Sequence, residues 1–190
     1  MLSDLDDPAA LDPALTGAKA AWLAQARQAG LPVLPGVVVG VGHCRDYLQI
    51  GIDQLADHGS GRARMAITAA GLSDDLGRRL SDRVADFPAP LVVRSSSGLE
   101  GSGLWSGAFT SYLDIRPDEL AKAVVGCYSS VFTQATVDRF AAAGVSPAKA
   151  AIAVLIQPAL DPDFGGTARI VGDDVILVGV KGSPVPLVQG

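Results

Sequence analysis

The sequence lacks the long apolar segment that a membrane-spanning helix requires. No apolar run in its 190 residues approaches the roughly 20 residues that cross a bilayer. The first residues, Met1 to Asp12, are acidic and contain neither the basic nor the apolar region of a signal peptide. We therefore expect a protein that has no membrane partner and works in the cytoplasm.

Cysteine and histidine are scarce, with two residues of each. Cys44 and Cys127 lie far apart in apolar helical patterns, which favours buried free thiols over a disulfide or a catalytic pair. His43 and His58 have no Ser, Cys or acidic constellation near them in the sequence, so capping or solvated roles are expected. Metal-ligand spacings of the CxxC, HExxH and EF-hand types are absent, and we assign no metal ligands.

The chain also has no excess of basic residues. Its 15 Lys and Arg residues are outnumbered by 20 Asp and Glu residues, for a formal net charge of -5. Nucleic-acid affinity depends on clustered cations that neutralise phosphates, so this composition argues against a nucleic-acid partner. A small anionic ligand needs only one or two placed cations and fits the composition. The phosphate-binding patterns Walker A and GxGxxG are both missing.

What the chain does contain is apolar sequence with clear periodicity. Hydrophobic residues make up 48% of it, enough to bury the core of one domain or of one domain with two lobes. Helical spacing predicts helices that begin at Thr16, near Tyr47, at Ser73 and after Pro117, and a further helix that ends at Gly144. The helix near Tyr47 is expected to end at 58–61. Apolar runs predict strands at 37–41, 91–94, 109–115 and 151–157, and a hairpin of 167–171 and 175–180. This order predicts an α+β domain with packed helices and a mixed, largely antiparallel sheet.

A glycine-rich and serine-rich stretch after the strand at 91–94 is the most informative segment. Arg94 ends the strand, and residues 95–107 follow as a predicted loop. Glycines let backbone N–H groups converge on an anion, hydroxyls add donors, and an arginine supplies a fixed charge. The alternative is a flexible surface loop beside an ordinary surface arginine, and composition does not decide between the two.

Lys19 stands in the first turn of the helix that begins near Thr16. Unpaired backbone donors and the positive end of the helix dipole favour an anion there. The alternative is a solvated helix lysine. If Lys19, Arg94 and the loop grip one anion, they must converge on one concave surface. The two tryptophans, Trp22 and Trp105, are interpreted as packing residues rather than stacking platforms.

Several segments together resemble one family of phosphotransferases. The first segments are Gly17-Ala18-Lys19-Ala20-Ala21-Trp22-Leu23, Ala29-Gly30-Leu31-Pro32-Val33-Leu34-Pro35-Gly36 and Leu91-Val92-Val93-Arg94-Ser95-Ser96. The later ones are Trp105-Ser106-Gly107, Ser111-Tyr112-Leu113-Asp114-Ile115, Cys127-Tyr128-Ser129-Ser130-Val131-Phe132 and Val154-Leu155-Ile156-Gln157. In order and spacing they resemble the nucleotide-binding domain of phosphoenolpyruvate synthase, pyruvate phosphate dikinase and rifampicin phosphotransferase, which has an ATP-grasp fold. One departure is Ala18, where the family has the second glycine of GGK.

The resemblance implies a role for each matching position. Lys19 and Arg94 match the lysine and arginine that contact the ATP phosphates. Residues 95–107 match the mobile loop that closes over the phosphates, and residues 157–160 match the hinge that presents backbone groups to adenine. The nucleotide-binding residues implied are Lys19, Arg94, Ser95, Ser96, Gly101, Gly103, Gln157 and Leu160.

The resemblance also implies what the chain would do. Residues 1–14 are expected as an N-terminal tail and 15–190 as a partial ATP-grasp-like region. Its function would be to bind ATP in a phosphotransferase that is completed by further domains or a partner subunit. Mg²⁺ would be a cofactor held by acids outside this chain. The alternative is a non-catalytic module of the same fold that binds a nucleotide or a partner. A third interpretation, an unrelated α+β domain, requires the ordered motifs to be coincidence.

Overall fold

A computed structural model describes residues 1–102 and 104–184 of the chain. The described residues form two compact units, 1–158 and 159–190, the second described as far as residue 184. Residues 1–14 belong to the first unit rather than to a tail, because strand β1 (Leu2–Asp4) pairs with β2 (Val37–Val39). Leu5 and Ala10 are buried. The acidic residues among them obscured this apolar pattern in the sequence.

The first unit is built on a five-stranded sheet. Its strands lie in the order β1, β2, β5 (Ile152–Pro158), β3 (Leu91–Ser97) and β4 (Ser111–Ile115). Every pairing within this sheet is antiparallel. The central strand β5 is buried along its whole length, as its unbroken apolar run predicts. The α+β class with an antiparallel sheet is therefore confirmed.

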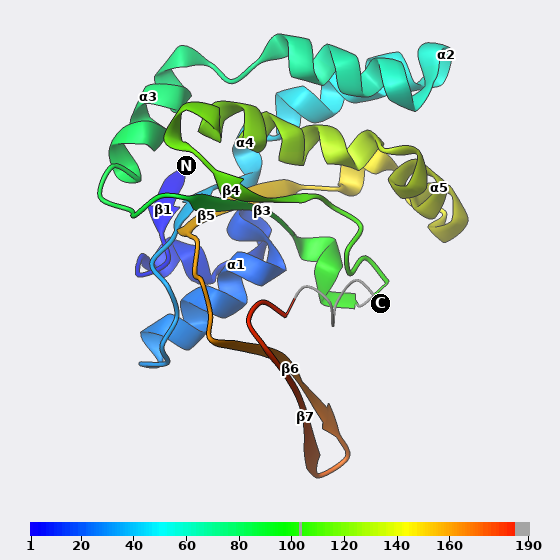
Figure 1. Cartoon of the computed structure of the whole chain (residues 1–190). Coiled ribbons are helices and arrows are strands. Elements are labelled where there is room, and N and C mark those ends of the chain that lie inside the picture. Colours follow the sequence, from blue (N-terminus) through cyan, green and yellow to red (C-terminus); the bar gives the residue numbers. More distant parts are fainter. Residues whose placement is uncertain (103, 185–190) are drawn as a thin grey trace. The chain divides into compact units, whose positions relative to one another are not determined.

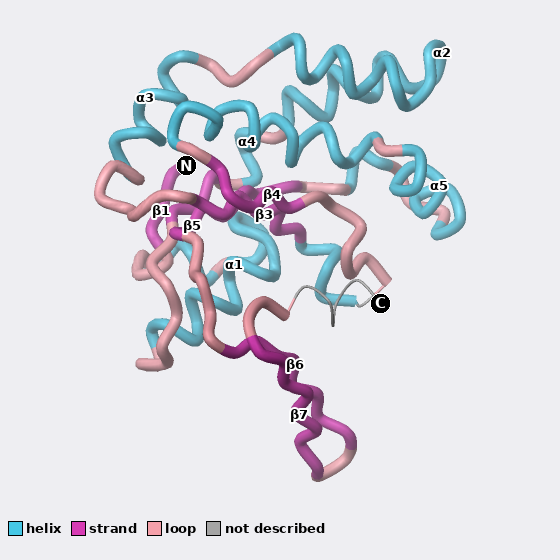
Figure 2. Tube along the Cα trace, viewed as in Figure 1, coloured by secondary structure: helices cyan, strands magenta, loops and turns pink. Residues whose placement is uncertain are grey.

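Helices cover both faces of this sheet (Figures 1 and 2). Helix α1 (Pro13–Gln28) lies on one face. The opposite face carries four helices: α2 (Arg45–Ala70), α3 (Asp74–Arg83), α4 (Leu120–Ser129) and α5 (Gln134–Ala143). Strand alternation divides the core accordingly. In β5, Ala153 and Leu155 pack with α1, whereas Ile152, Val154 and Ile156 join the larger core beneath the other helices.

Local signals position several helix ends, with two exceptions. The Ser73 hydroxyl accepts a hydrogen bond from the Leu76 N–H and caps α3, and Gly144 ends α5 in the left-handed conformation. The helix expected to begin at Thr16 begins at Pro13, where the Asp12 side chain accepts a hydrogen bond from the Ala14 N–H. The expected end of α2 at 58–61 is wrong. Gly59, with φ of 77°, only breaks the helix, which resumes and runs to Ala70.

The second unit contains a β-hairpin. Strands β6 (Phe164–Val171) and β7 (Asp174–Lys181) pair around a turn at Gly172 and Asp173, which confirms the predicted hairpin. Its register places four apolar side chains on one face, Phe164, Ile170, Val175 and Leu177, and each is at least 63% exposed. A lone two-stranded ribbon of this kind is only marginally stable in water.

Candidate functional site

The site begins with a break in helix α1. Gly17 has φ of 74° and ψ of 164°, a conformation that essentially only glycine adopts. A side chain there would overlap the backbone carbonyl of Ser96, so the glycine also permits close approach of α1 to strand β3. The Ser96 hydroxyl accepts a hydrogen bond from the Ala20 N–H at 3.0 Å. The strand thus caps the helical segment that restarts after Gly17, and Lys19 lies in its first turn.

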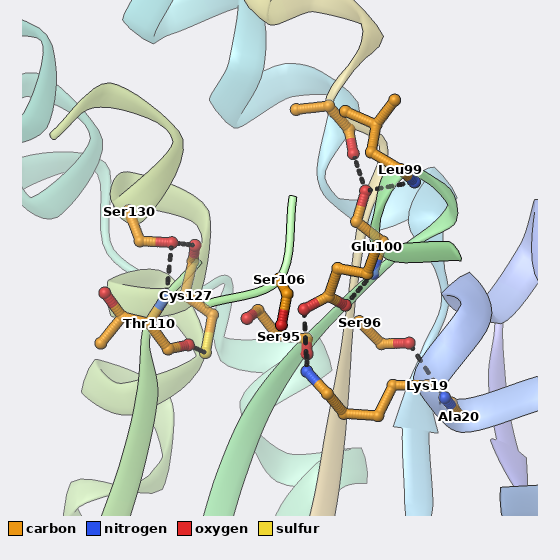
Figure 3. A network of polar contacts seen from close by, with 12 residues as sticks. Lys19, Ala20, Ser95, Ser96, Leu99, Glu100, Ser106, Thr110, Cys127 and Ser130 are labelled. Carbon is orange, nitrogen blue, oxygen red and sulfur yellow. Dashed lines mark hydrogen bonds and ion pairs between the residues drawn. The ribbon is translucent and has the colours of Figure 1, made fainter. Parts of the chain in front are cut away.

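Lys19 reaches from this turn to strand β3 and the segment after it. Its Nζ donates to the Ser95 carbonyl oxygen at 2.5 Å and lies 3.0 Å from Glu100 Oε1 (Figure 3). Glu100 belongs to the 3₁₀ helix η3 (Gly98–Ser102), and its other oxygen accepts from the Ser97 N–H at 3.0 Å. The Lys19 and Glu100 side chains are 25% and 10% exposed, so water screens this ion pair only in part.

Arg94 faces the same side of the sheet. Its partner across the strand pairing is Leu155, which packs with α1, and alternation puts Arg94 on that face. Burial lowers the pKa of the Arg94 guanidinium from its usual value, and the Glu100 carboxylate opposes this shift. Within the described part of the chain, the Arg94 side chain has no hydrogen-bond or ion-pair partner. A partly buried arginine that has no direct hydrogen-bond or ion-pair partner attracts an anion.

A pocket of about 360 Å³ joins these residues. It is lined by Lys19, Trp22, Leu23, Arg94, Glu100 and Ser106. The structure therefore brings Lys19 and Arg94 to one concave surface, as the sequence predicts, together with Glu100 and Ser106 from the segment after β3. Two cations and one carboxylate leave the pocket positively charged, which suits an anionic ligand.

The predicted phosphate loop starts later than expected. Ser95 and Ser96 continue strand β3 and are fully buried, so the irregular segment begins at Gly98. Ser96 uses its hydroxyl to cap α1, and Ser95 meets Lys19 through its carbonyl oxygen. The Ser95 hydroxyl is buried with no hydrogen-bond partner among the described residues. Neither residue is in the pocket lining, and both contact the α1 segment that carries Lys19.

The remaining predicted positions lie in different places. Gly101 is exposed on η3 beside the Trp22 indole, and Gly103 lies outside the described residues. Gln157 is buried at the end of β5, where its Nε2 donates to the Leu34 carbonyl oxygen at 3.1 Å. Leu160 is 67% exposed in the second unit. The structure places none of these three described residues in the pocket lining, and their roles in binding stay predictions.

Comparison with known families decides what kind of domain this is. Residues 13–173 match the model of the family described as pyruvate phosphate dikinase, AMP/ATP-binding domain. The chain belongs to this family. A search of curated proteins finds no match. The matched region includes the break at Gly17, Lys19, Arg94, η3 and Gln157. The chain is accordingly the AMP/ATP-binding part of a pyruvate phosphate dikinase-like phosphotransferase.

The sequence analysis misjudged two pocket residues, Trp22 and Glu100, but interpreted Trp105 correctly. Trp105 is buried against Phe140, with ring centroids 4.4 Å apart, so its packing role is confirmed. The packing interpretation of Trp22 is wrong, because its side chain is 59% exposed and lines the pocket. The buried side of α1 consists of small alanines instead. Glu100 was not predicted as a site residue, because its partner Lys19 is 81 residues away in the sequence.

Among the described residues of this nucleotide-binding domain, neither a thiol nor a histidine lines the pocket. Cys44 and Cys127 are free and buried, as predicted, and burial raises the pKa of each thiol to about 12. The His43 ring nitrogen Nε2 lies 2.9 Å from the Met1 amino group. Burial, followed by the charges of that amino group and Arg79, lowers the pKa of His43.

Two other depressions suit phosphate less well. A wider one, of about 630 Å³, is lined by Asp74, Asp82, Asp118 and Arg78 among others, and its excess of acids repels an anion. Another, of about 320 Å³, has Arg64 and Lys122 in its lining. Both of these cations are exposed, so water weakens their attraction for an anion.

The part of the chain that the structure describes provides no group of three or more His, Cys, Asp or Glu residues that could hold a metal ion. A separate finding is that no helix among the described residues is long and apolar enough to cross a membrane.

Proposed function

We propose that the pocket between α1, β3 and η3 holds the phosphates of ATP, and that the domain serves phosphoryl transfer once further domains or a partner subunit complete it. The proposal rests on one observation above all. Lys19 and Arg94 come from separate elements yet line the same pocket, and Arg94 has no partner there among the described residues. Two convergent cations, one of them without a direct partner among the described residues, suit the charge of a polyphosphate.

The start of the α1 segment after Gly17 adds to this attraction. Backbone N–H groups in the first turn of a helix are unpaired by helix geometry, and the helix dipole is positive at that end. The Ala20 N–H is already satisfied by the Ser96 hydroxyl, so the contribution we propose here is that of the positive end of the helix dipole. A phosphate beside Lys19 would benefit from the lysine charge and from this dipole together.

In the complete enzyme these residues would position and neutralise the phosphates rather than react with them. Phosphoryl transfer depends mainly on orientation and on stabilising charge that develops on phosphate oxygens. We assign this role to Lys19 and Arg94, and we propose that residues 98–102 and 104–107 exclude water. Mg²⁺, when bound, would neutralise charge on the phosphates, and we propose that acids outside this chain would hold it.

The adenine contact is proposed through backbone groups at the end of β5. The Gln157 side chain already donates to the carbonyl oxygens of Leu34 and Pro35, at 3.1 and 3.5 Å. Because the Gln157 amide nitrogen already forms hydrogen bonds within the domain, we propose that main-chain groups at 157–160, rather than this side chain, contact the base. A location in the cytoplasm also stays a prediction.

Calorimetric titration of ATP tests the proposal. Arg94→Ala removes a charge-assisted contact, worth about 1.5 to 3 kcal/mol, and should weaken affinity roughly ten-fold to a hundred-fold. Arg62→Ala is the matched control, because Arg62 is exposed on α2 with no partner among the described residues. Gln157→Ala should weaken binding less than Arg94→Ala. Equal affinities for wild type and Arg94→Ala would contradict the phosphate role.

A further inference from the structure

Glu100 makes two contacts that tie the proposed phosphate site together. One carboxylate oxygen pairs with the Lys19 ammonium at 3.0 Å, and the other accepts from the Ser97 N–H at 3.0 Å. Figure 3 shows the carboxylate between strand β3 and the Lys19 side chain. The Glu100 side chain is only 10% exposed, so it is held in this position rather than extended into water.

This carboxylate presents to Lys19 the same chemistry as a phosphate oxygen. Both are anionic acceptors that form short charge-assisted hydrogen bonds with an ammonium group. An ammonium has three donors, and the Ser95 carbonyl oxygen takes one of them at 2.5 Å. A phosphate that binds Lys19 must therefore either displace Glu100 or share Lys19 with it. Sharing would place two anions close together in a partly desolvated pocket, which is unfavourable.

We propose that Glu100 is an internal competitor of the nucleotide, which occupies Lys19 in the empty site and must release it when phosphate binds. This inference rests on the proposed function, because it concerns the same pocket. Glu100 belongs to η3, so its release from Lys19 also affects how η3 is held against α1. When the carboxylate leaves Lys19, η3 loses its ion pair with α1, so phosphate binding is coupled to the position of this segment. Glu100 thus lowers affinity and makes release of the nucleotide easier.

The test is calorimetric titration of ATP into the whole chain and into Glu100→Gln. Glutamine has the same shape and keeps acceptor capacity for the Ser97 N–H, but it has no charge. Because the competing ion pair is partly exposed, we expect Glu100→Gln to bind ATP about three-fold to ten-fold more tightly than wild type. Glu119→Gln is the control, since Glu119 pairs with Arg116 at the entry to α4 and lies outside the pocket lining.

A second variant separates charge from shape. Glu100→Asp keeps the negative charge with a shorter reach and should remain within about two-fold of wild type. Tighter binding by Glu100→Gln alone supports the competitor role. Equal or weaker binding by Glu100→Gln, with wild type binding ATP, overturns it and leaves the proposed function standing. Absence of ATP binding by wild type and by Glu100→Gln overturns both.

Discussion

Substitution of Gly17 by alanine is the sharpest test of how α1 presents Lys19. Gly17 combines φ of 74° with ψ of 164°, a region that costs other residues about 1 to 3 kcal/mol. An added Cβ would also overlap the Ser96 carbonyl and hydroxyl. Relief of that overlap requires α1 to move away from β3, which breaks the hydrogen bond from the Ala20 N–H to the Ser96 hydroxyl and costs about 1 kcal/mol more.

The expected loss is therefore about 3 kcal/mol or more in the free energy of unfolding, which corresponds to about 6 to 12 °C in Tm for a chain of this size. Urea and thermal denaturation, followed by circular dichroism, measure it. Gly77→Ala is the matched control, because Gly77 lies within helix α3, where an added methyl group would meet open space. That variant should gain up to about 1 kcal/mol. Gly17→Ala with unchanged stability would refute the reasoning.

Three further outcomes are expected. Burial raises the pKa of Cys44 and Cys127 to about 12, so both thiols should resist iodoacetamide at pH 8 in the folded chain and react after unfolding in guanidinium. Because the unfolded thiols ionise at lower pH, the free energy of unfolding should fall as pH rises above about 9. Fast labelling of either folded thiol would contradict their burial. Backbone amides of β6 and β7 should exchange with deuterium faster than those of β5, since the hairpin strands are exposed, and slow hairpin exchange would count against that explanation. The chain alone should release no phosphate or AMP from ATP with magnesium, and turnover that disappears in Arg94→Ala would show that the catalytic acids lie within it.

Much of the first unit could be predicted from local patterns. The apolar run expected as a strand at 151–157 forms the buried central strand β5 (Ile152–Pro158), and Ser73 and Gly144 are strong signals for helix ends. The predictions that were wrong relied on residues that are compatible with more than one local structure. Gly59 reads as a helix end, yet a single residue at positive φ can bend the chain and let the helix resume. A serine-rich segment such as 95–97 reads as a loop.

Some residues of the candidate site could likewise be predicted from the sequence, and others could not. Lys19 and Arg94 were predicted to share one concave surface, and both line the pocket, although Arg94 lies within β3 rather than at its end. The burial of Ser96 could not be predicted, because it depends on a tertiary contact. The Ser96 hydroxyl accepts a hydrogen bond from the N–H of Ala20, 76 residues away in the sequence. Glu100 was hidden for the same reason, since a carboxylate in a glycine-rich segment shows its partner only once α1 and β3 are packed together.

The most direct test of the proposed phosphate site is an experimental structure of the chain with ATP. We predict phosphate oxygens within about 2.7 to 3.2 Å of both the Lys19 ammonium and the Arg94 guanidinium, with the Glu100 carboxylate moved away from Lys19. Phosphates bound elsewhere, for example in the depression lined by Arg64 and Lys122, with the Lys19–Glu100 pair intact, would contradict it.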